Sequence, residues 1–176
     1  MEGKPITSDY IRASEFERLM SRLPYKYRLP VLLAAETGYR IGDLCSALNA
    51  AYDRNAETLT IKEAKTGKQR TVHLTETAKA ALLELDAWQP LRTLLCVQPS
   101  GKKYDRVTIW RWVSSTWQEM GMDDRTITPH SFRKLYAVRK RLCGVSLRDV
   151  QHDLNHDHPT TTMIYYYADK LAGVDA

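Results

Sequence analysis

The sequence predicts a mainly α-helical domain with one small antiparallel β-sheet, and three features of the chain lead to this fold class. Apolar residues recur at helical spacing through most of the chain. Two short segments, 56–61 and 69–74, instead alternate and are rich in Thr, Val, Ile and Leu, as strands are. The polar stretch "KEAKTGKQ" between them is centred on Gly67, so we expect a hairpin with a basic tip.

Helices are expected on both sides of this hairpin. Segment 13–23 has apolar residues at helical spacing, Ser14 as its candidate N-cap and Pro24 as its stop. Segment 27–38 is apolar enough for a buried helix that ends at Gly38, and a short helix resumes at Arg40. After the hairpin, helices are expected over residues 75–88, 104–121, 130–144, 146–156 and 159–170.

Length and charge narrow the class of protein. The 176 residues suit one domain, which we place at residues 13–176 after a leader or linker at residues 1–12. The net charge of +5 favours a polyanionic partner such as nucleic acid, without establishing one. The chain shows neither a secretory signal nor a run of apolar residues long enough for a membrane, so a soluble cytoplasmic protein is expected.

The three cysteines, Cys45, Cys96 and Cys143, lie far apart and fit neither a disulfide framework nor a zinc ribbon. Each has apolar neighbours in the sequence. We therefore expect three buried thiols in a reducing compartment.

The stretch "TPHSFRK" places His130 and Arg133 three residues apart, in a helix that Pro129 can open. Residues at this spacing share one helix face, so an imidazole and a guanidinium should point the same way. A basic surface helix in a basic protein would show the same pair, and this motif alone does not decide between the two interpretations.

Three more signals are individually weak. Arg40 lies at the junction of two helices, where it could reach outward, although Asp43 at i+3 could equally make it a surface ion pair. The hairpin tip should present Lys65, Lys68 and Arg70, which suits either a phosphate backbone or plain solvent.

The third signal lies near the C-terminus, where His156 precedes a helix that contains Tyr165. His152 and His156 have the i, i+4 spacing of zinc ligands, but no glutamate follows His152 and no further ligand is evident, so no metal is expected. The other two tyrosines of the "YYY" run could be ordinary core or surface aromatics.

The order of these motifs is more specific than any of them alone. "TGYRIGDL", "KTGKQRTVHL" and the stretch from "TPHSFRK" to "TTTMIYY" resemble the catalytic domain of the tyrosine recombinases, the phage integrase family. The similarity runs from about Thr37 to Tyr167 and implies the catalytic-domain fold of that family. The chain begins about where that domain begins, so the N-terminal core-binding domain of most members is expected to be absent.

The resemblance assigns a role to each motif. Arg40 and Arg133 correspond to the two arginines that bind the phosphate, and Lys65 to the hairpin lysine, with Lys68 as the weaker candidate. His130 matches the histidine of the His-x-x-Arg box. His156 matches the family histidine that usually follows a glycine, and Tyr165 matches the nucleophile.

Two positions depart from the family pattern. Asn155 replaces the usual glycine, and asparagine tolerates a left-handed backbone better than most residues. Lys134 replaces a frequent second histidine. We expect Lys134, like Lys68 and Arg70, to contact DNA.

The implied chemistry is cleavage and rejoining of DNA through a 3′-phosphotyrosine, without metal, ATP or another cofactor. The implied function is site-specific DNA recombination or integration. A DNA-binding protein of the same fold without activity and a type IB topoisomerase are the alternatives. The expected partners are double-stranded DNA, further copies of the chain in a tetramer on DNA, and accessory directionality proteins, all at the nucleoid in the cytoplasm.

Overall fold

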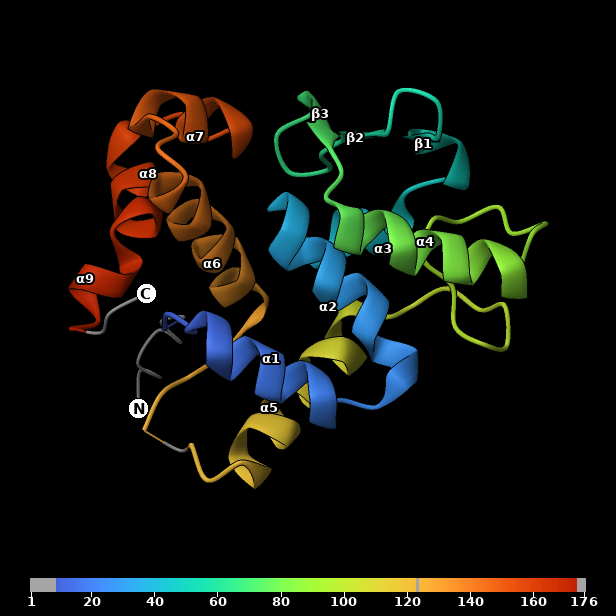
Figure 1. The fold of residues 1–176 in the computed structure, drawn as a ribbon, viewed down its shortest axis with the longest axis horizontal. Coiled ribbons are helices and arrows are strands. Elements are labelled where there is room, and N and C mark those ends of the chain that lie inside the picture. Colours follow the sequence, from blue (N-terminus) through green and yellow to red (C-terminus); the bar gives the residue numbers. More distant parts are fainter. Residues whose placement is uncertain (1–8, 123, 174–176) are drawn as a thin grey trace.

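The chain folds into helices with one small antiparallel sheet at an edge of the molecule, and the hydrophobic pattern predicts both kinds of element (Figure 1). The structure is a computed structural model that describes residues 9–122 and 124–173. The helices in this part of the chain are α1 (Ala13–Arg22), α2 (Tyr25–Thr37), α3 (Ile41–Ser46), α4 (Glu76–Trp88), α5 (Arg106–Glu119), α6 (Pro129–Leu142), α7 (Leu147–Asp153), α8 (Pro159–Tyr166) and α9 (Ala168–Leu171), with a 3-10 turn at Asn49–Ala51.

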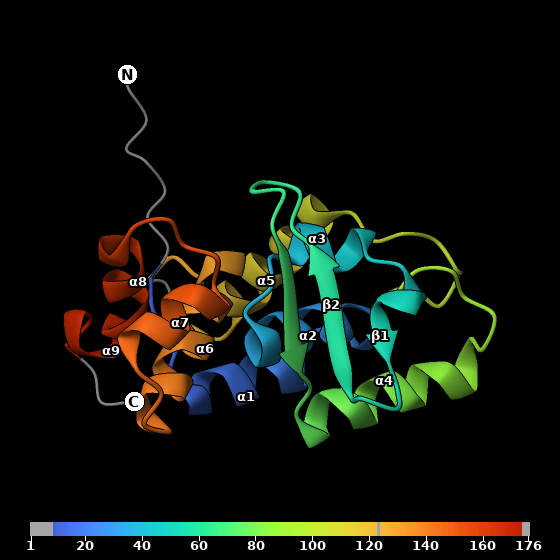
Figure 2. The same cartoon turned by 90° about the horizontal axis from the view of Figure 1, so that it is seen from above.

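The sheet has the order β1-β2-β3, with β1 at Tyr52–Asp53, β2 at Thr58–Lys62 and β3 at Gln69–His73. β2 and β3 form the predicted hairpin, and its loop projects from the body of the molecule (Figure 2). Gly67 in this loop has a φ of 68°, a left-handed conformation that glycine adopts without strain. β1 was not predicted because two residues are too few to show a period.

Helix α2 runs through the core, and Pro30 lies inside it. Proline has no backbone N–H, so the carbonyl of Lys26, four residues earlier, loses its helical partner. The hydroxyl of Tyr104 donates a hydrogen bond to this carbonyl instead. The contact lets the helix continue through Pro30 and ties α2 to the segment before α5.

The helix α6 packs between α2 on one side and α8 on the other, and α7 packs against both α6 and α8 (Figure 1). A small apolar cluster joins α6, α7 and α8 through Tyr136, Val150, Leu154 and Tyr166. The described helices include none that is both long and apolar enough to cross a bilayer.

Two predictions about local structure are wrong. α1 begins at Ala13 rather than after Ser14, because the carboxylate of Glu15 accepts the backbone N–H of Arg12 at 2.9 Å. Cys143 is exposed at the end of α6, whereas Cys45 and Cys96 are buried as expected.

The segment expected to be a leader contributes to the core. Tyr10 and Ile11 are 2% and 0% exposed and belong to the main apolar cluster. Residues 1–8 of that segment lie outside the described residues. The domain core therefore extends N-terminally beyond residue 13.

Candidate active site

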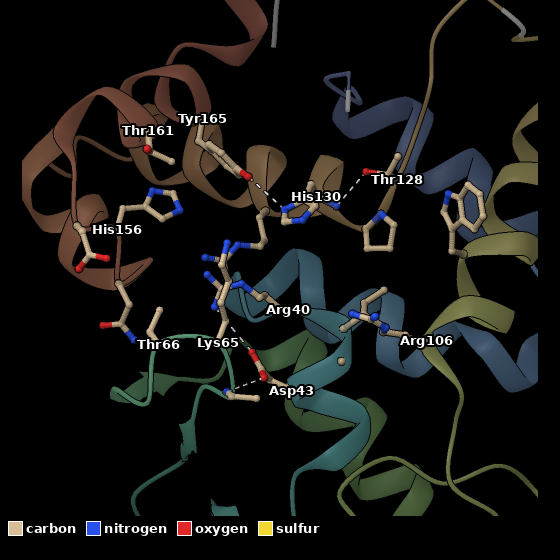
Figure 3. Close-up of a pocket in the computed structure, with 18 of the residues that line it drawn as sticks. Arg40, Asp43, Lys65, Thr66, Arg106, Thr128, His130, His156, Thr161 and Tyr165 are labelled. Atoms are coloured by element: carbon tan, nitrogen blue, oxygen red, sulfur yellow. Dashed lines mark hydrogen bonds and ion pairs between the residues drawn. The ribbon is translucent and has the colours of Figure 1, made fainter. Parts of the chain in front are cut away.

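Six parts of the chain converge on one cavity of about 1070 Å³ (Figure 3). They are the start of α3, the β2–β3 loop, the N-terminal half of α5, the start of α6, the loop before α8, and α8 itself. Among the cavity-lining residues are Arg40, Lys65, Arg106, Trp110, His130, Arg133, His156 and Tyr165. All six predicted catalytic residues are thus brought together, although they span most of the sequence.

Arg40 reaches the cavity from the turn between α2 and α3. Gly38 caps α2 with a φ of 67°, and this left-handed residue redirects the chain so that Arg40 becomes the N-cap of α3. The Nη1 atom of Arg40 donates to Glu63 Oε2 at 2.5 Å and lies 3.9 Å from Asp43 Oδ2. The guanidinium therefore has two acidic neighbours that orient it.

The α6 helix presents His130 and Arg133 on the same face, as their spacing predicts. The Thr128 side chain caps this helix by accepting the N–H of His130 at 3.2 Å. Arg133 is 1% exposed and donates to the carbonyls of Gly38 and Leu154, the latter at 3.0 Å. Its guanidinium therefore joins the end of α2 to the end of α7.

The hydroxyl of Tyr165 lies 3.2 Å from Nδ1 of His130, within hydrogen-bond distance (Figure 3). Its ring also packs edge-on against His156, with ring centroids 5.0 Å apart. Tyr166 is buried, and its hydroxyl donates to the carbonyl of Val145 at 2.6 Å. Of the tyrosine run, Tyr165 is the residue that lines the cavity.

The loop before α8 carries His156. Nδ1 of His156 lies 3.1 Å from Thr162 Oγ1, a contact that holds the ring against α8. The preceding Asn155 has a φ of 50°, a left-handed conformation that asparagine tolerates better than most residues. Asparagine can adopt this conformation as a single residue, so the missing glycine is compatible with the turn.

Burial and the clustered cations determine the protonation of the site. Partial desolvation lowers the pKa of His130, and Arg133 and Arg40 lower it further. Desolvation, with the same two arginines, lowers the pKa of His156 to about 4. Desolvation raises the pKa of Tyr165, although Arg133 and Arg40 oppose the rise. At neutral pH the site thus holds two neutral imidazoles beside a protonated phenol. In the tautomer that carries its proton on Nε2, His130 can accept the phenol proton at Nδ1.

The hairpin loop separates the two lysine candidates. Lys65 lines the cavity, whereas Lys68 forms an exposed ion pair with Asp157 at 2.6 Å. Lys134 is half-buried on α6 beside the cavity, and desolvation lowers its pKa, with Asp9 raising it. The geometry therefore favours Lys65 over Lys68 as the lysine that meets the substrate.

The prediction that a protruding tip presents Arg70 is wrong. Arg70 is 5% exposed, and it donates to the carbonyls of Thr37 (2.6 Å) and Asp153. Its guanidinium also lies 3.9 Å from the centroid of the Tyr39 ring. Side chains alternate between the two faces along β3, so Arg70 lies on the same buried face as Val72. The alternation was visible in the sequence, but the charge of Arg70 led us to expect an exposed side chain.

Glu63 is the site residue that sequence reasoning missed. It is 0% exposed and lies between Arg40 and Arg133. Every second side chain from Leu59 through Ile61 to Glu63 is buried, so the alternation in the sequence indicated a buried Glu63. The neighbouring residues are polar and rich in lysine, and they suggested instead that the side chain of Glu63 is exposed to solvent.

The histidine-rich stretch before α8 does not form a metal site in the part of the chain that the structure describes. His152 is exposed on α7. Across residues 9–122 and 124–173, no three His, Cys, Asp or Glu side chains gather so that they could hold a metal ion.

A buried arginine beside a partly exposed one, a hairpin lysine, two histidines and a tyrosine around one cavity are typical of the catalytic domain of tyrosine recombinases. Residues 9–171 match the model of the phage integrase family, and the chain belongs to this family. The predicted family and fold class are therefore confirmed.

Named relatives support this family assignment. The tyrosine recombinase XerA of Pyrococcus furiosus is 28% identical over 161 residues, which cover 86% of this chain and 54% of XerA. A crystal structure of XerA recombinase superposes with a TM-score of 0.78 at 26% identity, covering 96% of this chain and 64% of that one. The chain spans about half the length of the curated relatives it matches.

A more distant structure shares the fold. A lambda integrase tetramer bound to a Holliday junction superposes with a TM-score of 0.77 at 20% identity, covering 92% of this chain and 49% of that one. At this identity the likeness concerns the fold alone.

Proposed function

We propose that this chain is the catalytic domain of a site-specific DNA recombinase or integrase, which cleaves and rejoins double-stranded DNA through a 3′-phosphotyrosine. The observation that carries the proposal is the Tyr165 hydroxyl 3.2 Å from His130 Nδ1, in a cavity also lined by Arg40 and Arg133. A nucleophile, a base and a phosphate clamp are the groups that phosphoryl transfer to a phenol needs.

We infer the following steps from the arrangement of the site and from the resemblance to the family. Arg40 and Arg133 hold the non-bridging oxygens of the scissile phosphate and stabilise the charge that grows on them. The oxygen of Tyr165 attacks phosphorus while Nδ1 of His130 takes the phenol proton. The bond from phosphorus to the 5′-oxygen breaks, and Lys65 gives that oxygen its proton.

The other groups support this reaction and its reversal. His156 uses Nδ1 toward Thr162, so its Nε2 remains for a phosphate oxygen. The phosphotyrosine keeps the energy of the broken bond, and attack by a 5′-hydroxyl rejoins the strand without ATP. The arginines and the lysine neutralise the charge on the phosphate, which a metal ion would otherwise do. We therefore expect the chemistry to proceed in EDTA.

The test uses nicked suicide DNA, which traps the covalent adduct. The wild-type protein should form an adduct that maps to Tyr165, Tyr165→Phe should form none, and Tyr166→Phe should keep the reaction. An adduct on Tyr166, or cleavage by Tyr165→Phe, would contradict the assignment. Relaxation of supercoiled DNA without strand exchange would favour a type IB topoisomerase instead.

Assembly belongs to the proposal as well. In the described residues the C-terminal segment folds back on its own domain, since Asp169 of α9 is buried and accepts a hydrogen bond from Arg141 of α6. We therefore expect a monomer without DNA and a tetramer on DNA, with directionality proteins as further partners at the nucleoid. Light scattering with and without a two-site DNA tests this, and a stable tetramer in free solution would refute it.

A further inference from the structure

Glu63 is a fully buried carboxylate that contacts two cations of the site, Arg40 and Arg133. Glu63 comes directly after β2. Its side chain points to the same buried side as Leu59 and Ile61, and it is 0% exposed. An ionised carboxylate is costly to bury unless cations and donors surround it. The identity of its partners therefore indicates what the residue does.

Both oxygens of Glu63 face the arginines that we assign to the phosphate. Oε2 accepts from Arg40 Nη1 at 2.5 Å and from Thr66 Oγ1 at 3.3 Å. Oε1 lies 3.8 Å from Arg133 Nη1 and, within the described part of the chain, has no hydrogen-bond partner. One carboxylate thus lies between two guanidinium groups that come from separate helices.

We propose that Glu63 is a positioning residue of this site, which holds Arg40 and Arg133 at a fixed separation before DNA binds. The inference rests on the proposed function. Arg40 and Arg133 carry like charges and repel each other. Burial lowers the pKa of Arg133, Arg40 and Arg70 lower it further, and Glu63 raises it. The carboxylate offsets this repulsion where no phosphate is present to do so.

The same carboxylate reaches the hairpin loop. Its bond from Thr66 fixes the loop residue that follows Lys65. Glu63 therefore joins three of the groups that must meet the phosphate: both arginines directly and Lys65 through the loop.

The contacts leave room for substrate. Among the described residues, both acidic partners of Arg40, Glu63 and Asp43, contact its Nη1 atom. Nη2 and Nε of Arg40 remain to form a fork on a phosphate. Glu63 therefore orients the guanidinium without occupying all of its donors.

The proposal separates the rate of cleavage from the affinity for DNA. Glu63→Gln keeps the shape of the side chain but removes a negative charge beside the place of the phosphate. DNA should bind as tightly or more tightly, because the site becomes more positive. Cleavage at saturating DNA should slow by about 10- to 100-fold, because the arginines are no longer held in place.

A matched control lies in α1, away from the cavity. Glu15 is also buried, at 5% exposed, and accepts hydrogen bonds from Arg125 at 2.5 and 3.2 Å, away from the cavity. Glu15→Gln makes the same change in a buried glutamate–arginine pair. It should lower stability and leave the cleavage rate at saturating DNA unchanged.

The experiment measures single-turnover adduct formation on suicide DNA for wild type, Glu63→Gln, Glu15→Gln, Arg40→Ala and the Arg40→Ala/Glu63→Gln double variant, with DNA affinity measured separately. If Glu63 acts through Arg40, its effect should largely disappear in the Arg40→Ala background. If Glu63→Gln fails to fold, Glu63→Asp takes its place, because it keeps the charge but is too short to reach both arginines.

Each outcome decides the matter. A wild-type rate for Glu63→Gln, a loss equal to that of Glu15→Gln, or a loss that adds fully to that of Arg40→Ala would overturn the positioning role. An inactive wild-type protein would instead refute the proposed function. We expect Glu63→Gln to cleave more slowly with undiminished DNA affinity, and its effect to be much smaller in the Arg40→Ala background.

Discussion

Replacing Gly38 with alanine should destabilise the protein and displace a catalytic group. Gly38 has a φ of +67°, and an added Cβ would lie 2.7 Å from Tyr136 Cδ1 and 3.0 Å from Leu154 Cδ2. Both neighbours belong to the small cluster between α6, α7 and α8, so neither can move away freely. The carbonyl of Gly38 also accepts a hydrogen bond from Arg133.

The magnitude follows from two contributions. A left-handed backbone costs an alanine about 1–2 kcal/mol. Overpacking in a dense core adds about 1–3 kcal/mol. The loss of stability should therefore be about 2–5 kcal/mol, a large share of the roughly 5–15 kcal/mol of a typical domain.

Gly121 supplies the control. It has a φ of +72°, but an added Cβ would meet nothing within 4 Å. Gly121→Ala should therefore lose only the backbone contribution, about 1–2 kcal/mol. Urea unfolding at pH 7 compares the midpoints, and adduct formation below the transition reports the displacement of Arg133. Equal midpoints for the two variants would show that the clash at Gly38 is not real.

Three further predictions concern pH, thiols and salt. The unfolded His156 takes up a proton near pH 6.5 but the folded one only near pH 4, so the free energy of unfolding should fall between these pH values as the solution is acidified. Urea midpoints should show a smaller fall for His156→Asn, and an unchanged pH dependence would contradict the desolvated imidazole. A thiol reagent should label Cys143 rapidly in the native protein, but Cys45 and Cys96 only after unfolding, because burial protects them and raises the pKa of Cys45 to about 12. Rapid native labelling of a second thiol would refute this. DNA affinity should fall with a log–log salt slope of about −2 to −4, as expected if two to four phosphates are neutralised, and a flat response in a filter-binding titration would exclude phosphate-dominated binding.

The sequence by itself determined the features that depend on near neighbours. The three-residue spacing and the opening Pro129 placed His130 and Arg133 on one face of α6. Strand alternation around Gly67 predicted the hairpin, and a terminal glycine predicted the end of α2 at Gly38. The residue type of Asn155 indicated that a left-handed backbone would be tolerated there, and its φ is 50°. Each of these depends on contacts within a few residues, which composition and spacing report.

The tertiary structure decided where the buried charges go. Arg70 looked like a solvated cation of the hairpin, yet its hydrogen bonds reach 33 residues back to Thr37 and 83 residues forward to Asp153. Glu63 looked like a loop residue, yet it pairs with Arg40, 23 residues earlier, and faces Arg133. A charge can be buried only where the fold brings its partner, and the chain order of the residues does not state which distant partner that will be.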